Sequence, residues 1–180
     1  MGDTERGQPT GGTAFLLTCM RGAAIGCVAA VVQVLVSQIV GLATGHRERT
    51  DVAPRLVQRS AERLGTSPSR PLRWFLATVF HFGYGIGWGV LYTLACGSPR
   101  LRRTPPWLSG GLLGGVVYTL AFSRIGGGTL VGSERHPDRR GWYELVIHWA
   151  SALSFAQVVA YTERWSRDGL GQAEDGEAHG

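Results

Sequence analysis

Five polar side chains lie within long apolar segments of the sequence, and these are the groups that could carry chemistry. They are Gln38, His81, Arg124, Glu144 and His148, and we refer to them as the predicted polar cluster. Two histidines with a carboxylate can pass a proton, conduct an ion or hold a divalent metal, and ionisable groups inside a membrane span are functional candidates by default. The same side chains can also be structural, with arginine and glutamate as an ion pair and each histidine bonded to a carbonyl or hydroxyl that sets the helix register.

We favour the structural interpretation of these side chains. The protein would then be a membrane protein that binds a partner or has a role in membrane physiology. Two alternatives stay open. One is a proton- or cation-coupled transporter or channel subunit that uses His81, Glu144 and His148, and the other is a metal-binding membrane protein. The sequence contains no HExxH, no GxSxG and no paired-carboxylate motif, and each of these would indicate a specific hydrolytic chemistry. We therefore predict that the protein is not an enzyme and uses no cofactor.

Four apolar segments must position these side chains. They are residues 22–44, 74–96, 107–125 and 142–165. The first two contain no charged residue, and each is long enough to cross a bilayer, which takes about 20 apolar residues. A cleaved signal peptide is the alternative for the first segment, but its apolar run is longer than such peptides have. Because backbone groups in lipid must be satisfied within each segment, we predict an all-α membrane protein with a four-transmembrane-helix bundle.

The alternation of the spans places the predicted polar cluster at one depth. The second and fourth helices enter from the same side, which we call the loop face, and the third ends there at Arg124. At about 1.5 Å per residue, His81 lies about 10 Å beyond Trp74, and His148 lies about 9 Å into the fourth segment. Glu144 lies one helical turn from His148. We expect these side chains to meet near the loop-face leaflet, and the even number of spans predicts both termini on one side.

Composition and charge indicate which partners to expect. The chain has 180 residues, and its 18 basic residues, all of them arginine, outnumber 13 acidic ones to give a net charge of +5. This length suits one domain rather than separate cofactor and substrate lobes. The arginines bracket the apolar segments instead of forming one stripe, so we predict no nucleic-acid binding. The expected partners are the lipid bilayer and either a second copy of the chain or another membrane protein.

The connection between the first two spans predicts a short amphipathic helix over residues 53–64, lying in the headgroup region. Asp51 could cap its start, Pro54 suits its first turn and Gly65 could end it. Three arginines would face water or lipid phosphate: Arg55, Arg59 and Arg63. Residues 13–165 would form the membrane domain. We predict that the two polar, Gly-rich ends are disordered, namely residues 1–12 and the acidic tail of residues 166–180.

Small residues recur four positions apart in the apolar segments, which lets helix backbones approach closely in lipid. The pairs with glycine at both positions in the second and third segments are Gly83/Gly87, Gly85/Gly89, Gly110/Gly114 and Gly111/Gly115. A nucleotide-binding glycine loop would need a preceding strand and exposure to water, which does not fit this setting. We predict that these glycines are helix-packing surfaces, either within one chain or between chains.

The same residues carry a family resemblance. The second span contains His81-Phe82-Gly83-Tyr84-Gly85 followed by Gly89 and Tyr92, and the fourth begins Trp142-Tyr143-Glu144. Over about residues 22–165 the chain resembles the YagU-like family of small multi-pass inner-membrane proteins. The resemblance implies a multi-pass bundle with a middle helix bearing His, Gly and Tyr, located in the bacterial inner membrane, and it implies no particular activity.

Overall fold

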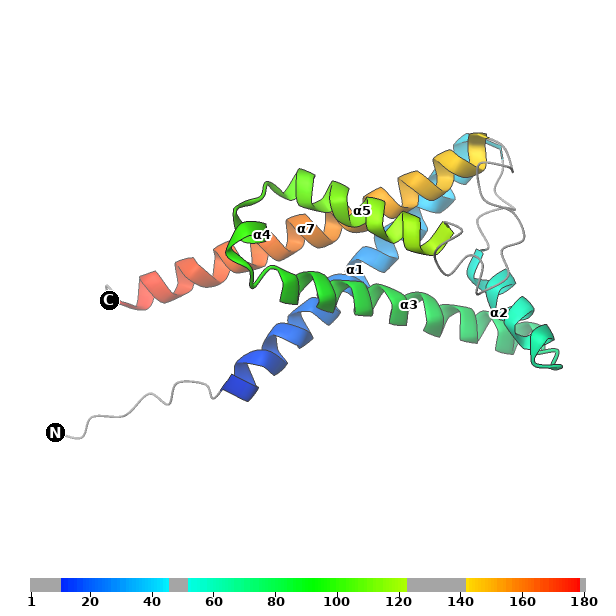
Figure 1. Ribbon diagram of the computed structural model, residues 1–180, viewed down its shortest axis with the longest axis horizontal. Coiled ribbons are helices and arrows are strands. Elements are labelled where there is room, and N and C mark those ends of the chain that lie inside the picture. The colour runs from blue at the N-terminus through cyan, green and yellow to red at the C-terminus, as the bar shows by residue number, and fades with distance from the viewer. Residues whose placement is uncertain (1–10, 46–51, 123–141, 179–180) are drawn as a thin grey trace.

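The computed structural model describes residues 11–45, 52–122 and 142–178, and it describes side chains for residues 11–45, 53–121 and 146–169. Every regular element in these ranges is a helix, which confirms the predicted all-α class (Figure 1). In chain order the described helices are α1 (Gly11–Ala43), α2 (Val52–Arg63), α3 (Arg70–Ala95), α4 (Pro99–Arg103), α5 (Pro106–Phe122) and α7 (Trp142–Ala178).

Helices α1 and α7 pack against each other at the centre of the bundle, with α3 packed on α1 and α5 packed on α7. Contacts at both ends show that α1 and α7 are antiparallel. Arg21 near the start of α1 bonds to Glu163 late in α7, and Ser37 further along α1 bonds to Ser151 earlier in α7. In Figure 1 the first turn of α1 and the last turn of α7 accordingly lie toward the same end of the molecule.

The core is built mainly from small and aromatic side chains. Phe155 and Val159 of α7 are among the most buried side chains of the described chain, and alanines beside them let α1 approach closely. A second cluster joins α5 to α7, where the Tyr118 ring stacks on Trp149 with centroids 4.0 Å apart. The larger cluster contains Ile25, Ala29, Tyr92, Cys96, Phe155, Ala156, Val159 and Ala160.

The predicted amphipathic helix corresponds to α2, and its end follows from local chemistry. Gly65 has a φ of +71°, which glycine adopts without steric cost. The Gly65 N–H donates to the Glu62 carbonyl at 3.1 Å, and the Thr66 N–H donates to the Ala61 carbonyl at 2.9 Å. This pair of bonds is a Schellman motif that satisfies the last carbonyls of the helix. Asp51, the predicted cap at the other end, lies outside the described residues.

Two of the described helices, α1 and α3, are long and apolar enough to cross a membrane, judged by length and composition. Helix α5 is described over 17 residues, which is at the lower end of the range that can span a bilayer. A proline lies in the first turn of α3, α4 and α5. Proline is tolerated there because the N–H groups of the first turn have no acceptor within the helix, so the N–H that proline lacks costs no helical hydrogen bond.

The ends of the first and last helices in the chain differ from the prediction. Helix α1 begins at Gly11, well before residue 22, and α7 continues to Ala178 where a disordered tail was expected from Ser166. Glu163 pairs with Arg167 one turn later, and the Ser166 hydroxyl donates to the Glu163 carbonyl at 2.9 Å, so side-chain contacts favour continuing the helix past residue 165. The short helix α4 was also not predicted. Residues 1–10 lie outside the described range.

Candidate functional site

The closest helix contact is between α1 and α3, and glycines make it possible. A Cβ added at Gly22 would lie 2.7 Å from the Val90 Cα, and one added at Gly85 would lie 2.9 Å from the Ala30 Cβ. A Cβ at Gly26 would collide with the Gly85 carbonyl. Any side chain larger than hydrogen would therefore push these two backbones apart, as expected of a small-residue seam.

The same seam includes Gly89, where an added Cβ would lie 2.7 Å from the Gly26 Cα. A second seam joins α5 to α7. There an added Cβ would lie 2.9 Å from the Gln157 Oε1 at Gly110 and 3.0 Å from the Leu153 Cδ2 at Gly114. Four of the eight predicted packing glycines thus face a neighbouring helix of the same chain.

The remaining four do not contact another helix among the residues that the structure describes. At Gly83, Gly87, Gly111 and Gly115 an added Cβ meets no described atom within 4 Å. Because residues two positions apart on a helix point about 200° apart, only one of two interleaved glycine pairs can face a given neighbouring helix. Their packing between chains stays a prediction.

The structure describes three of the five side chains of the predicted polar cluster. The His81 Nε2 lies 3.2 Å from the Ala30 carbonyl oxygen of α1, so this ring contacts the backbone of the neighbouring helix. His148 is buried on α7, and Gln38 is half-buried on α1. Arg124 and the side chain of Glu144 lie outside the described residues. A single connected cluster of all five therefore stays a prediction.

A different polar site is fully formed at the opposite end of the bundle. Its centre is Glu163 on α7, whose side chain is 0 % exposed. The Arg21 Nη2 of α1 donates to the Glu163 Oε1 at 2.9 Å, and the Arg167 Nε lies 3.3 Å from the same oxygen. The Thr93 hydroxyl of α3 donates to the Glu163 Oε2 at 3.3 Å. We call these four residues the Glu163 network.

A second buried polar contact joins α3 to α5 at the same end of the bundle. The Tyr92 hydroxyl, beside Thr93 on α3, donates to the Ser109 Oγ of α5 at 2.8 Å. The Ser109 Oγ also lies 3.3 Å from the Pro105 carbonyl oxygen. Tyr92, Thr93 and Ser109 are all buried. The terminal end of the bundle thus holds two sets of polar contacts, the Glu163 network between α1, α3 and α7 and the Tyr92–Ser109 bond between α3 and α5.

Burial explains why Glu163 needs so many partners. A carboxylate withdrawn from solvent is costly unless charges and hydrogen bonds compensate it. Arg21 and Arg167 are themselves largely covered, with side chains 27 % and 22 % exposed. With both arginines charged the network carries a formal net charge of +1, and its contacts tie three helices together at one level. Chemically, it can lock helix register and retain a negative charge inside the bundle.

Sequence reasoning missed this site although its members were visible. The predicted polar cluster includes neither Arg21, which directly precedes the first apolar segment, nor Glu163, which lies near the end of the fourth. The signal that could have found the site is opposite charge at the same depth. Arg21 and Glu163 each lie near the terminal end of an apolar segment, and the two segments run in opposite directions. The depth argument used for the histidines, applied to the other face, would have paired them.

No metal centre is evident in the part of the chain that the structure describes, because no three side chains of His, Cys, Asp or Glu come together there. Cys19, Cys27 and Cys96 are free thiols, and Cys96 is buried. Comparisons with models of known protein families, with curated proteins and with solved structures found no match for this chain.

Proposed function

We propose that this chain is a non-enzymatic, multi-pass integral membrane protein of the bacterial inner membrane, with α1, α3, α5 and α7 as its spans. Its role in this proposal is to bind a partner within the bilayer, either another membrane protein or a second copy of itself. The observation that carries the proposal is the distribution of polarity: the described chain buries ion pairs and exposes large apolar side chains.

The exposed apolar side chains are large and extend along whole helices. Phe15, Met20, Ile39 and Phe75 are each 60–63 % exposed, whereas Glu163 is completely buried. Single exposed apolar residues are normal in water, but continuous apolar faces on soluble monomers are rare and mark interaction surfaces or membrane contact. Lipid around the helices would cover these faces, and the Glu163 network would satisfy the charges inside.

A partner would find a suitable surface on α3. Gly83 and Gly87 lie on a side of α3 where no described residue would meet an added Cβ, and Phe80 and Leu91 are exposed on the same helix. In lipid, apolar side chains give little driving force for association, so close backbone approach at small residues is what selects a helix partner. The open side of α3 at Gly83 and Gly87 therefore supports a partner-binding role, and it is the surface at which that role can be tested.

The resemblance to YagU-like inner-membrane proteins supports the same location and a multi-pass bundle. Within the proposal, the Glu163 network holds the bundle together and the α3 surface provides the contact. The His81 ring supports a structural role for that residue, since its nitrogen reaches a backbone carbonyl of α1.

The proposal is tested by membrane extraction and topology. Membranes containing the full chain are washed with alkaline carbonate, and reporters are fused in separate experiments to the two ends. We expect the chain to stay in the membrane and both reporters to read the same side. Release into the supernatant would contradict integral insertion, and reporters that read opposite sides would contradict four spans.

A further inference from the structure

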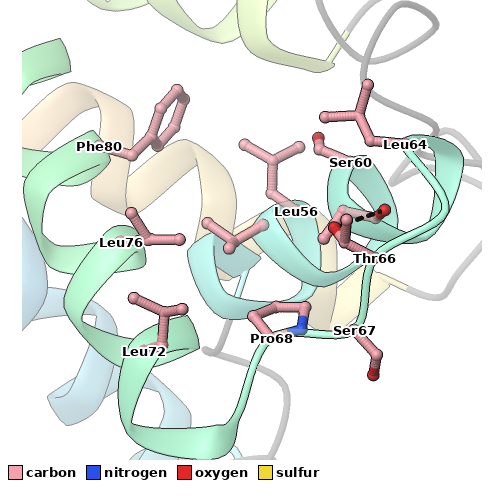
Figure 2. A pocket seen from close by; sticks show the side chains of 11 residues that line it. Leu56, Ser60, Leu64, Thr66, Ser67, Pro68, Leu72, Leu76 and Phe80 are labelled. Atoms are coloured by element: carbon pink, nitrogen blue, oxygen red, sulfur yellow. Dashed lines mark hydrogen bonds between the residues drawn. The ribbon is translucent and has the colours of Figure 1, made fainter.

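An apolar hollow lies between α2 and the first half of α3, at the loop face (Figure 2). Its volume is about 600 Å³. Leu72, Leu76 and Phe80 recur every fourth residue on one face of α3 and point toward the hollow, and Leu56 of α2 faces them (Figure 2). The Thr66 hydroxyl at its edge already donates to the Ala61 carbonyl at 3.1 Å. The hollow therefore offers an apolar surface for an apolar ligand.

The length of the hollow is close to that of one leaflet. Its lining residues on α3 run from Leu72 to Phe80, which lies eight residues further along the helix. At about 1.5 Å per residue this is roughly 12 Å. The hydrocarbon core of a bilayer is about 30 Å thick, so the hollow covers most of the depth of one acyl chain layer.

The two helices that line the hollow are rich in arginine. Residues 52–73 contain five arginines and one acidic residue, Glu62. Two of the arginines, Arg63 and Arg70, are exposed and flank the turn that closes the hollow between α2 and α3. Basic residues close to the bilayer surface attract anionic headgroups, each by about fivefold in affinity.

The two walls are held in place independently of any ligand. The Arg73 Nη1 of α3 donates to the Gln58 Oε1 of α2 at 2.6 Å, and the Gln58 Nε2 donates to the Glu62 Oε1 at 2.9 Å. The first bond holds α2 beside α3 and the second orients Gln58 within α2, so a ligand need not order the site when it binds. Preformed sites lose less affinity to conformational ordering.

We propose that this hollow binds one acyl chain of an anionic phospholipid, with the phosphate placed beside Arg63 and Arg70. The proposal rests on the membrane location proposed above. Charge complementarity selects the occupant: a zwitterionic phospholipid would make the same apolar contacts but would carry no net charge for the arginines to bind. Headgroup preference is therefore the property that the arginines confer.

The test uses the full chain purified in detergent and supplemented with phosphatidylglycerol or phosphatidylcholine of identical acyl chains. Retention of each lipid is measured by native mass spectrometry, and stability by thermal melting. We expect phosphatidylglycerol to be retained more strongly and to raise the Tm more, with a preference that declines as salt increases. Equal retention and equal Tm shifts for the two lipids would overturn the proposal.

Variants separate the site from general lipid contact. In R63Q/R70Q we expect the phosphatidylglycerol preference to fall by about 25-fold, whereas the matched control R102Q/R103Q, which removes two exposed arginines from α4 at the other end, should keep it. Leu76→Trp would fill the hollow and lower retention of both lipids. A preference that survives in R63Q/R70Q would overturn the assignment. If the chain stays in carbonate-washed membranes but does not prefer phosphatidylglycerol, only this inference is contradicted. If carbonate releases the chain, the membrane location is contradicted as well.

Discussion

Replacing Glu163 by glutamine should destabilise the bundle more than any other conservative change at its terminal end. The glutamine keeps the size of the side chain but removes the negative charge that faces Arg21 at 2.9 Å and Arg167 at 3.3 Å. Removing one member of a buried ion pair costs about 3–5 kcal/mol, because the remaining charge loses its compensation. Since both arginines are partly exposed, and water can reach part of that charge, we expect the lower end, about 3 kcal/mol.

The arginine side of the network should respond less strongly. In Arg21→Gln the Glu163 carboxylate keeps Arg167 and the Thr93 hydroxyl as partners. The expected loss is then about 1.5–3 kcal/mol, the range for hydrogen bonds to a charged group. Because the two residues share one interaction, the double variant should lose less than the sum of the single variants, and the difference measures their coupling.

The assay is thermal melting of the full chain in detergent, with Arg164→Gln as the matched control. Arg164 lies next to Glu163 in sequence, but its side chain is 47 % exposed and its contact with Asp168 is 3.9 Å long. An exposed pair of this kind contributes about 0–1 kcal/mol. If Glu163→Gln melts at the same temperature as Arg164→Gln, the reasoning about a buried network is wrong.

Two further outcomes follow from packing. Gly89→Leu should abolish the folded yield in detergent, because its Cβ would meet Gly26 of α1. Gly87→Leu should leave the stability of the monomer unchanged and weaken any self-association detected by crosslinking. Equal loss of folded yield in both variants would contradict the assignment of Gly89, rather than Gly87, to the face that packs on α1. His81→Phe should lower the stability of the protein by about 0.6–1.7 kcal/mol, the range for interhelical hydrogen bonds in membrane proteins. The melting midpoint measures this change, and a gain in stability would show that the contact between His81 and Ala30 is not favourable.

Much of the local structure could be predicted from the sequence. The amphipathic helix expected over residues 53–64 is α2, and Gly65 ends it with the positive φ that its lack of a side chain permits. The helical class followed from segments too long and apolar for other structures. The extension of α7 to Ala178 could not be predicted in the same way, because the polar, glycine-containing end of the chain has no apolar periodicity to indicate a helix.

The sequence by itself determined where helices form and which positions are small or charged, because those properties depend on neighbouring residues along the chain. Tertiary structure decided which of them meet. Gly83/Gly87 and Gly85/Gly89 are equivalent as motifs, yet they point about 200° apart on α3, and the rotation of that helix against α1 brings only the second pair into contact. The same holds for Arg21 and Glu163, which lie 142 positions apart in the sequence and become an ion pair only when α1 and α7 pack antiparallel.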